Sequence, residues 1–175
     1  MGWSEFLYVA AMPVVSFQDL PPVARVWVFA SDRPLRDKDS ALLLREVDLF
    51  LAQWRAHGHA LRCARDWRDD HFLAIGVDPT AEQASGCSLD GLFRGLQTLE
   101  RVLKTRLVAG GRIFYRDAAG SARLAPRPDI DALAAAGALT PKTPVFDLSV
   151  TAAADYRARF ERPAAETWVA ALLPG

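Results

Sequence analysis

Apolar positions change their spacing several times along the chain, and each spacing predicts a different kind of element. Residues 25–30, Arg-Val-Trp-Val-Phe-Ala, are rich in β-branched and aromatic side chains on both faces, which predicts a central strand. Apolar residues then recur every three or four positions over about 37–54 and again over about 89–107, which predicts two helices. Between the helices, the runs 61–67 and 71–77 predict the two arms of a hairpin.

The ends of the two helices are predicted from the residues that flank them. Asp37 and Asp39 favour a helix N-terminus because their negative charges face the positive end of the helix dipole. His57-Gly58 follows the first helix, and glycine is common just after a helix C-terminus, so we expect the helix to close there. Ser88 can cap the second helix, and Gly110-Gly111 breaks it.

A strand over 112–116 completes the order βαββαβ in the first two thirds of the chain. This order predicts a ferredoxin-like antiparallel sheet covered by two helices. The residues that follow predict a hairpin partner near 121–125, short helices, and a strand over 145–150. We therefore predict an α+β fold with a ferredoxin-like core and a C-terminal extension of hairpin, helix and strand.

The predicted elements divide the chain into three parts. Met12-Pro-Val-Val-Ser reads as the natural start of a domain, so we predict Met12 as the native start and residues 1–11 as a non-native or disordered extension. Residues 12–116 form the predicted α+β core domain. Residues 117–175 form an extension that either packs on the core or makes a small subdomain.

Composition and charge exclude several classes of function. The chain has 175 residues, half of them apolar, with 21 basic and 21 acidic side chains. This balance argues against binding to nucleic acid or to an anionic membrane, since both need a basic excess. No apolar run approaches the ~18 residues that a membrane-spanning helix needs. Two cysteines make no disulfide framework, so we expect a cytoplasmic protein with reduced thiols.

Several segments together resemble one family of small bacterial proteins. They are Arg25-Val-Trp-Val-Phe, Trp54-Arg-Ala-His-Gly58, Ala84-Ser-Gly-Cys-Ser-Leu-Asp90 and Gly137-Ala-Leu-Thr-Pro-Lys-Thr-Pro-Val-Phe146, together with Thr151 and Trp168. Members of this family are often labelled "ABC transporter ATPase". The resemblance covers the chain from about residue 12 to the end, and it implies a shared fold unit without an established biochemical activity.

The residues do not support ATP hydrolysis. A phosphate-binding loop of this class needs Gly-x-x-x-x-Gly-Lys-Ser/Thr between a strand and a helix. Lys104-Thr105 instead follows Val102-Leu103 inside the second predicted helix, whose leucines recur every three or four residues. Gly110-Gly111-Arg112 lies between a helix and a strand, the reverse of the order that cradles phosphates, so we interpret it as a helix stop.

The best candidate for chemistry is Cys87, at the start of the second helix. Unpaired backbone N–H groups there favour a thiolate, and small or polar neighbours would line the site: Ser85, Gly86, Ser88 and Asp90. A general base is still needed. In the predicted sheet, His57 and His59 lie at the Cys87 end, whereas His71 lies at the opposite end. We therefore predict catalytic roles for Cys87, His57 and His59.

Two simpler interpretations of the same residues remain open. Small residues before a helix make a cap, and a small thiol packs well in a core. His57-Gly58-His59 with Cys87 could also offer three zinc ligands. His-x-His is a weak signal on its own, however, and a histidine near a helix C-terminus is favoured by the dipole. We expect neither a metal nor a cofactor.

Two hypotheses for function follow. The first is a small-ligand-binding protein or an enzyme, with its pocket near Cys87 and the His57-Gly58-His59 turn. The second is a non-catalytic interaction or assembly module that engages a protein partner through an open sheet edge or through its tail. The sequence names neither the small molecule nor the partner, and it leaves open whether the chain forms a homodimer.

Overall fold

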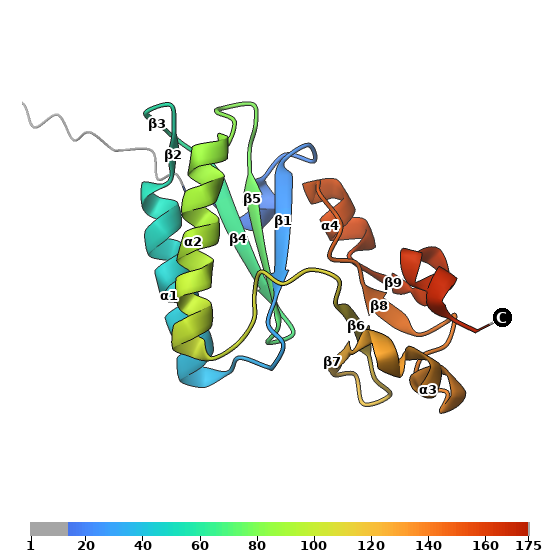
Figure 1. Cartoon of the computed structure of the whole chain (residues 1–175). Coiled ribbons are helices and arrows are strands. Elements are labelled where there is room, and N and C mark those ends of the chain that lie inside the picture. Colours follow the sequence, from blue (N-terminus) through green and yellow to red (C-terminus); the bar gives the residue numbers. More distant parts are fainter. Residues whose placement is uncertain (1–13, 175) are drawn as a thin grey trace, which may run out of the picture.

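The protein has an α+β fold with three small antiparallel sheets (Figure 1). The computed structural model describes residues 14–174, so the predicted extension over 1–11 and the predicted start at Met12 lie outside the described residues. The strands are β1 (Arg25–Ala30), β2 (Arg55–Ala56), β3 (His59–Ala60), β4 (Cys63–Arg68), β5 (Phe72–Val77), β6 (Ile113–Arg116), β7 (Ala122–Ala125), β8 (Pro144–Phe146) and β9 (Glu161–Pro163). The α-helices are α1 (Asp37–Gln53), α2 (Gly86–Leu103), α3 (Ile130–Ala135) and α4 (Ala153–Arg159), and the 3₁₀ helices are η1 (Phe17–Asp19), η2 (Arg127–Asp129), η3 (Ala164–Glu166) and η4 (Trp168–Leu172).

The first sheet has the strand order β1-β5-β4, and its strands pair antiparallel as the sequence predicts. Helices α1 and α2 cover one face of it (Figure 1). The core between them holds Leu43 and Leu51 of α1, Leu96 of α2, and Leu73 and Ile75 of β5, each at most 1% exposed. The three- and four-residue spacing of the helical leucines and the apolar strand therefore meet in one core.

The predicted ferredoxin-like sheet is not evident, because its fourth strand lies elsewhere. Strand β6 belongs to a separate sheet with the order β7-β6-β8-β9. Both edges of β6 are already used, since it pairs antiparallel with β7 on one side and with β8 on the other. The predicted strand over 145–150 is also shorter, ending at Phe146. The chain after β8 crosses instead to β1, where the N–H of Val26 donates to the carbonyl of Thr151 at 2.8 Å.

The two larger sheets share an aromatic core. The ring of Phe72 in β5 lies 4.4 Å from that of Phe146, 5.1 Å from Phe114 and 5.2 Å from Phe160. These side chains are nearly fully buried. Strand β6 lies before residue 117 and pairs with strands that lie after it, so this core joins the two sides of the predicted boundary.

The ends of the helices differ from the prediction. Helix α1 ends at Gln53, and His57-Gly58 is the turn of the small β2–β3 hairpin rather than a helix cap. His57 and Gly58 have φ of 51° and 82°, and a two-residue hairpin turn of this kind needs positive φ at both positions. Helix α2 begins at Gly86 and is capped by Ser85, three residues before the predicted cap.

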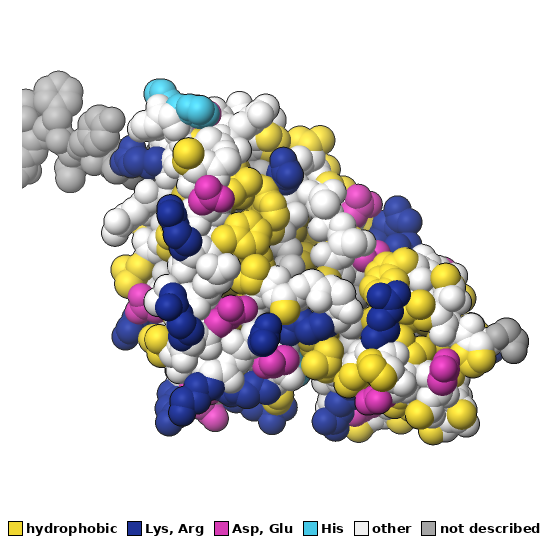
Figure 2. Space-filling view, viewed as in Figure 1, with side chains coloured by type: hydrophobic (Ala, Val, Ile, Leu, Met, Phe, Trp, Pro, Cys, Tyr) yellow, Lys and Arg dark blue, Asp and Glu magenta, His cyan; other side chains and the backbone are white. Residues whose placement is uncertain are grey.

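Charged side chains of both signs are scattered over the face in Figure 2, and hydrophobic side chains gather beside α2, toward β1. In the part of the chain that the structure describes, no helix is long and apolar enough to cross a membrane.

Candidate functional site

Cys87 lies in the first turn of α2 and is exposed. The helix begins at Gly86, three residues before the predicted start, so Cys87 lies inside its first turn. Gly86 and Asp90 are also exposed, so part of the predicted site is open to solvent. The other cysteine, Cys63, is fully buried in β4, and burial raises the pKa of its thiol to about 12.

The two serines of the predicted site hold the helix end together. The Oγ of Ser85 accepts a hydrogen bond from the N–H of Ser88 at 3.2 Å, and the hydroxyl of Ser88 donates to the carbonyl of Ser85 at 2.8 Å. The indole N–H of Trp54 donates to the carbonyl of Ser88 at 2.9 Å. The first of these bonds satisfies an N–H group that a helix start leaves unpaired, so Ser85 is the N-cap, and the other two tie the first turn of α2 to Ser85 and to Trp54.

His57 and His59 lie at the same end of the first sheet as the start of α2, as predicted (Figure 1). Both are exposed on the β2–β3 hairpin. No hydrogen bond within residues 14–174 joins either imidazole to Cys87. Over the same residues, no group of three His, Cys, Asp or Glu side chains is placed to hold a metal ion. The structure thus brings the three predicted catalytic residues to one end without assembling them.

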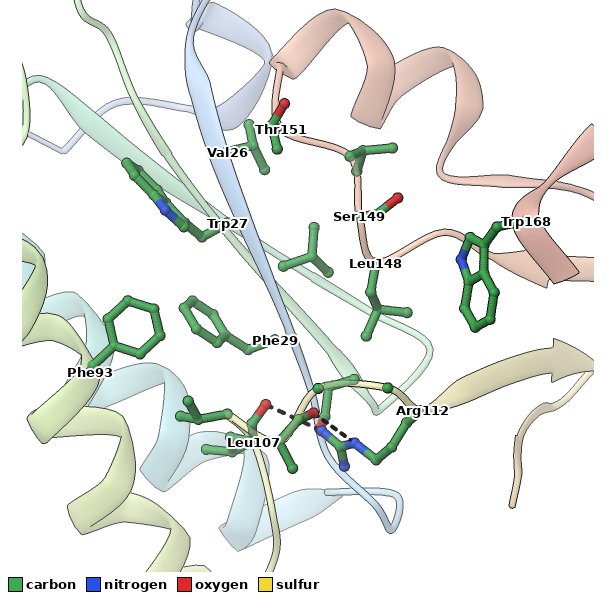
Figure 3. A pocket seen from close by; sticks show the side chains of 17 residues that line it. Val26, Trp27, Phe29, Phe93, Leu107, Arg112, Leu148, Ser149, Thr151 and Trp168 are labelled. Atoms are coloured by element: carbon green, nitrogen blue, oxygen red, sulfur yellow. Dashed lines mark hydrogen bonds between the residues drawn. The ribbon is translucent and has the colours of Figure 1, made fainter. Parts of the chain in front are cut away.

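A groove of about 440 Å³ lies along the outer edge of β1, away from the predicted site (Figure 3). One wall is the strand itself from Val26 to Ala30, and the opposite wall is the segment 148–151. The loop 107–112 closes the end next to Ala30. Phe93 of α2 and Trp168 of η4 complete the lining, and Trp168 is 45% exposed.

The edge of β1 in this groove carries backbone groups that make no internal hydrogen bond. Alternate residues of a strand point their N–H and C=O groups to opposite edges. The N–H groups of Val26 and Ala30 point away from β5, and they donate to the carbonyls of Thr151 and Leu107. Val28 points the same way, yet its N–H and C=O, like the C=O of Val26, have no partner among the residues that the structure describes.

Arg112 closes the groove at the end of β1; within residues 14–174 its hydrogen bonds go only to backbone carbonyls, and its guanidinium lies over the ring of Phe114, 5.7 Å from the centroid. Its Nε donates to Ala109 at 3.0 Å, its Nη1 to Arg106 at 3.1 Å, and its Nη2 to Leu107 at 3.3 Å and to Ala30. A guanidinium has five N–H donors, so one of them is left over.

No carboxylate in residues 14–174 forms an ion pair with Arg112. Burial lowers the pKa of its guanidinium, and the nearby charges of Asp32 and Glu100 oppose that shift. The groove therefore ends at a half-buried positive charge that lacks a bonded negative partner.

The loop that carries Arg112 is held in place by acidic side chains at its start. Glu100 accepts hydrogen bonds from the N–H groups of Leu107 at 2.6 Å and Val108 at 2.8 Å. The next three N–H groups, of residues 109–111, donate to no acceptor in the described part of the chain. Gly110 has negative φ and Gly111 has a φ of 72°.

Asp32 fixes the same loop from the end of β1. Its Oδ1 accepts from the hydroxyl of Thr105 at 2.6 Å and from the N–H of Arg106 at 3.2 Å. Burial alone would raise the pKa of Asp32. These hydrogen bonds and the charge of Arg112 outweigh burial, and the pKa lies below its usual value.

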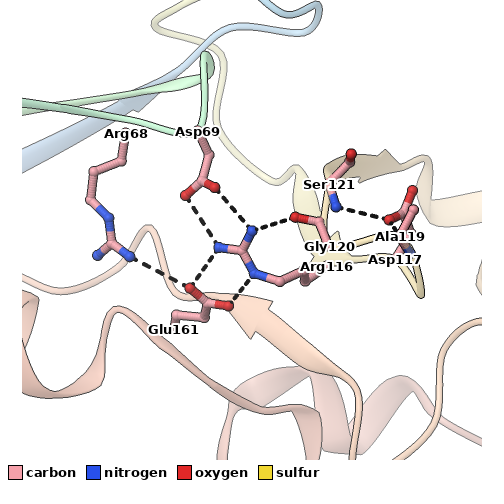
Figure 4. A network of polar contacts seen from close by, with 8 residues as sticks. All are labelled: Arg68, Asp69, Arg116, Asp117, Ala119, Gly120, Ser121 and Glu161. Carbon is pink, nitrogen blue, oxygen red and sulfur yellow. Dashed lines mark hydrogen bonds and ion pairs between the residues drawn. The ribbon is translucent and has the colours of Figure 1, made fainter.

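The far end of β6 carries a second arginine with the opposite surroundings (Figure 4). Arg116 donates to Asp69 at 2.9 and 3.2 Å and to Glu161 at 2.5 and 2.8 Å, which raises the pKa of its guanidinium. Arg68 also reaches Glu161, at 3.5 Å. This network ties the β4–β5 turn of the first sheet to β6 and β9 of the second.

His71 is buried beside this network, at the opposite sheet end from Cys87 as predicted. Its Nδ1 lies 2.8 Å from the carbonyl of Ser31, and its ring packs 5.7 Å from that of Phe114. Burial disfavours the charged imidazolium and lowers the pKa of His71. The contact with Ser31 and the charges of Asp69 and Asp70 act in the other direction.

The sequence gives only a partial signal for the groove. The run 25–30 predicts a central strand, so it does not reveal that one edge stays open. Gly110-Gly111-Arg112 marks the end of α2 but does not show where the arginine lies. No family model, curated protein or solved structure matches the chain.

Proposed function

We propose that this protein is a non-catalytic interaction module that binds an extended segment of a partner protein along β1. One observation carries the proposal: the N–H of Val28 and the carbonyls of Val26 and Val28 face a groove and have no hydrogen-bond partner within residues 14–174. An exposed strand edge of this kind is a template for one more strand. Backbone hydrogen bonds would provide affinity, and side chains pointing alternately to the two walls would provide specificity.

The walls define the chemistry of that segment. On the α2 side, Phe29 and Phe93 pack edge to face with centroids 5.5 Å apart. On the other side lie Leu148, Val150 and Trp168. Both walls are apolar, so the segment should carry apolar side chains on both faces near Val28. Exposed Trp168 is the kind of large, rigid side chain that often dominates binding energy.

The test removes the N–H of Val28 without removing an internal hydrogen bond. Proline is tolerated in an edge strand where its missing N–H faces outward. We expect Val28→Pro to stay folded and to lose at least tenfold in affinity for extended apolar hexapeptides, measured by fluorescence anisotropy. Trp27→Pro is the matched control, because the N–H of residue 27 points toward β5. Its loss should therefore destabilise the sheet, whereas the loss of the Val28 N–H should not.

A site-specific measurement accompanies the variants. A bound strand should slow hydrogen exchange of the Val28 amide at least tenfold, while the amide of exposed Val23 keeps its rate. Binding that protects other amides but leaves Val28 unchanged would contradict the proposal.

A second candidate function, a small-ligand or thiol site at Cys87, is favoured by the exposure of that cysteine in the first turn of α2. His57 and His59 would assist, and Ser85, Gly86, Ser88 and Asp90 would contact the ligand. A reactive thiol site predicts that Cys87 reacts with iodoacetamide at pH 7 faster in the folded chain than in the urea-unfolded chain. Buried Cys63 is the slow internal control. Equal rates in the two states, or no effect of His57→Ala and His59→Ala, would argue for a cap only.

A further inference from the structure

We infer that the segment bound along β1 is the C-terminus of a partner chain, with its α-carboxylate held by Arg112 and the loop 107–112. This inference rests on the proposed function and adds the chemistry and direction of the ligand. It starts from the asymmetry of the groove. At the Val26 end of the groove, β1 pairs through its backbone with Thr151, whereas the Ala30 end lies next to the cation of Arg112.

Charge complementarity favours a carboxylate at that end. Arg112 has no ion-pair partner in residues 14–174, is half-buried, and keeps one N–H donor unused. A carboxylate is the anion whose geometry suits a guanidinium. Placed here, it would supply the negative charge that the carbonyls of Ala30 and Leu107 supply only in part.

Backbone N–H donors next to Arg112 also favour a carboxylate ligand. The successive N–H groups of residues 109–111 have no acceptor in the described chain and lie next to Arg112 along the loop. A backbone arrangement of this kind is one established way to capture a terminal carboxylate. Exposed Gly110 also leaves room, since a Cβ placed there would meet no heavy atom within 4 Å.

The position of the cation sets the direction of the peptide. Because Arg112 contacts Ala30, at the C-terminal end of β1, the bound chain must run parallel to β1. In a parallel ladder, one peptide residue donates to the carbonyl of Val26 and accepts from the N–H of Val28. The residue two positions later donates to the carbonyl of Val28. The N–H of Ala30 is already bound to Leu107, so the peptide ends there with its carboxylate beside Arg112.

The experiment compares hexapeptides that are identical except at the C-terminus. A library with varied apolar residues at the last three positions is made in two forms, with a free carboxylate and with an amide. Binding to the full chain is measured by fluorescence anisotropy. We expect the best binders to lose at least tenfold in affinity on amidation, and to lose a similar factor when Arg112→Gln replaces the native chain. Arg112→Lys should retain part of the affinity, since it keeps the charge.

Each result bears on a different claim. Amides that bind within twofold of the acids would overturn carboxylate capture and leave strand addition along β1 standing. A library that binds in neither form would overturn both. Direction is tested with a spin label at the peptide N-terminus. Broadening of amide signals near Arg25 is expected, and broadening at Gly110 and Gly111 would overturn the parallel arrangement. The amide comparison needs no variant, so it remains decisive if Arg112→Gln fails to fold.

Discussion

The two arginines that flank β6 sit in opposite surroundings. Arg116, at its end, is paired with Asp69 and Glu161 and bridges the two larger sheets (Figure 4). Arg112, just before its start, lies over the ring of Phe114, donates hydrogen bonds only to backbone carbonyls within residues 14–174, and faces a groove (Figure 3). At one end of β6 an arginine therefore bridges the two sheets. At the other end, an arginine has no ion-pair partner within residues 14–174. The first end therefore stabilises the contact between the sheets, and the second is where we propose that a ligand binds.

The core between the two ends should show the largest effect on stability. Phe72 is fully buried and contacts the rings of Phe114, Phe146 and Phe160. We expect Phe72→Ala to lower the free energy of unfolding by about 3–5 kcal/mol, measured by urea denaturation, because it leaves a cavity between the sheets. Val102→Ala, at a position 60% exposed, is the control and should change it by less than about 0.5 kcal/mol.

Arg116 should come next. Arg116→Gln leaves the partly buried carboxylates of Asp69 and Glu161 without their main partner, so we expect a loss of about 1–3 kcal/mol. Arg123→Gln removes an exposed pair with Asp117, which solvent screens, and should change the free energy of unfolding much less. Equal costs in urea denaturation would show that the Arg116 network does not hold the sheets together.

The pH dependence of stability tests the lowered pKa of His71, the buried histidine beside the Arg116 network. The pKa of His71 is lowered in the folded chain, so the unfolded state binds more protons once the pH falls through about 6.5. Stability is therefore highest above that pH and decreases on acidification, by at most about 1.4 kcal/mol per pH unit. His71→Gln should flatten the urea midpoint between pH 7.5 and 5.

Carboxylates with lowered pKa values lose their contribution to the stability of the fold at a lower pH than His71 does. Asp32, Asp78 and Asp147 have lowered pKa values, so their stabilisation is lost only below about pH 4. A slope between pH 7.5 and 5 that persists in His71→Gln would therefore contradict the assignment to His71.

The smallest difference in stability between the two ends of β6 is expected for one glycine near each end. Gly111 and Gly120 have φ of 72° and 81°, and a Cβ at either position would meet no heavy atom within 4 Å. Alanine at each should cost about 1 kcal/mol through backbone strain alone. Thermal unfolding should give similar shifts for both variants. A much larger effect at Gly111 would mean that the loop has a structural role beyond its φ.

Local patterns predicted the elements better than their partners. The stripes of α1 and α2 and the hairpin of β4 and β5 are confirmed because burial of periodic apolar side chains is a local signal. His57-Gly58 was predicted as a helix end and is a hairpin turn, since both structures use residues with positive φ. Strand β6 was predicted correctly as a strand and wrongly as part of the first sheet. A strand's pattern shows which faces are apolar and does not show which edge it joins.

The sequence by itself determined the α+β class, the main helices, the hairpin of β4 and β5, and the absence of a phosphate-binding loop. Only the tertiary structure decided that β6 leaves the first sheet, that β1 has backbone groups without a partner in the described part of the chain, and that Arg112 lies beside them. The physical reason is the range of the interactions. Helix stripes and turns depend on residues a few positions apart, whereas strand pairing and the partners of a charge depend on segments that are distant in the chain.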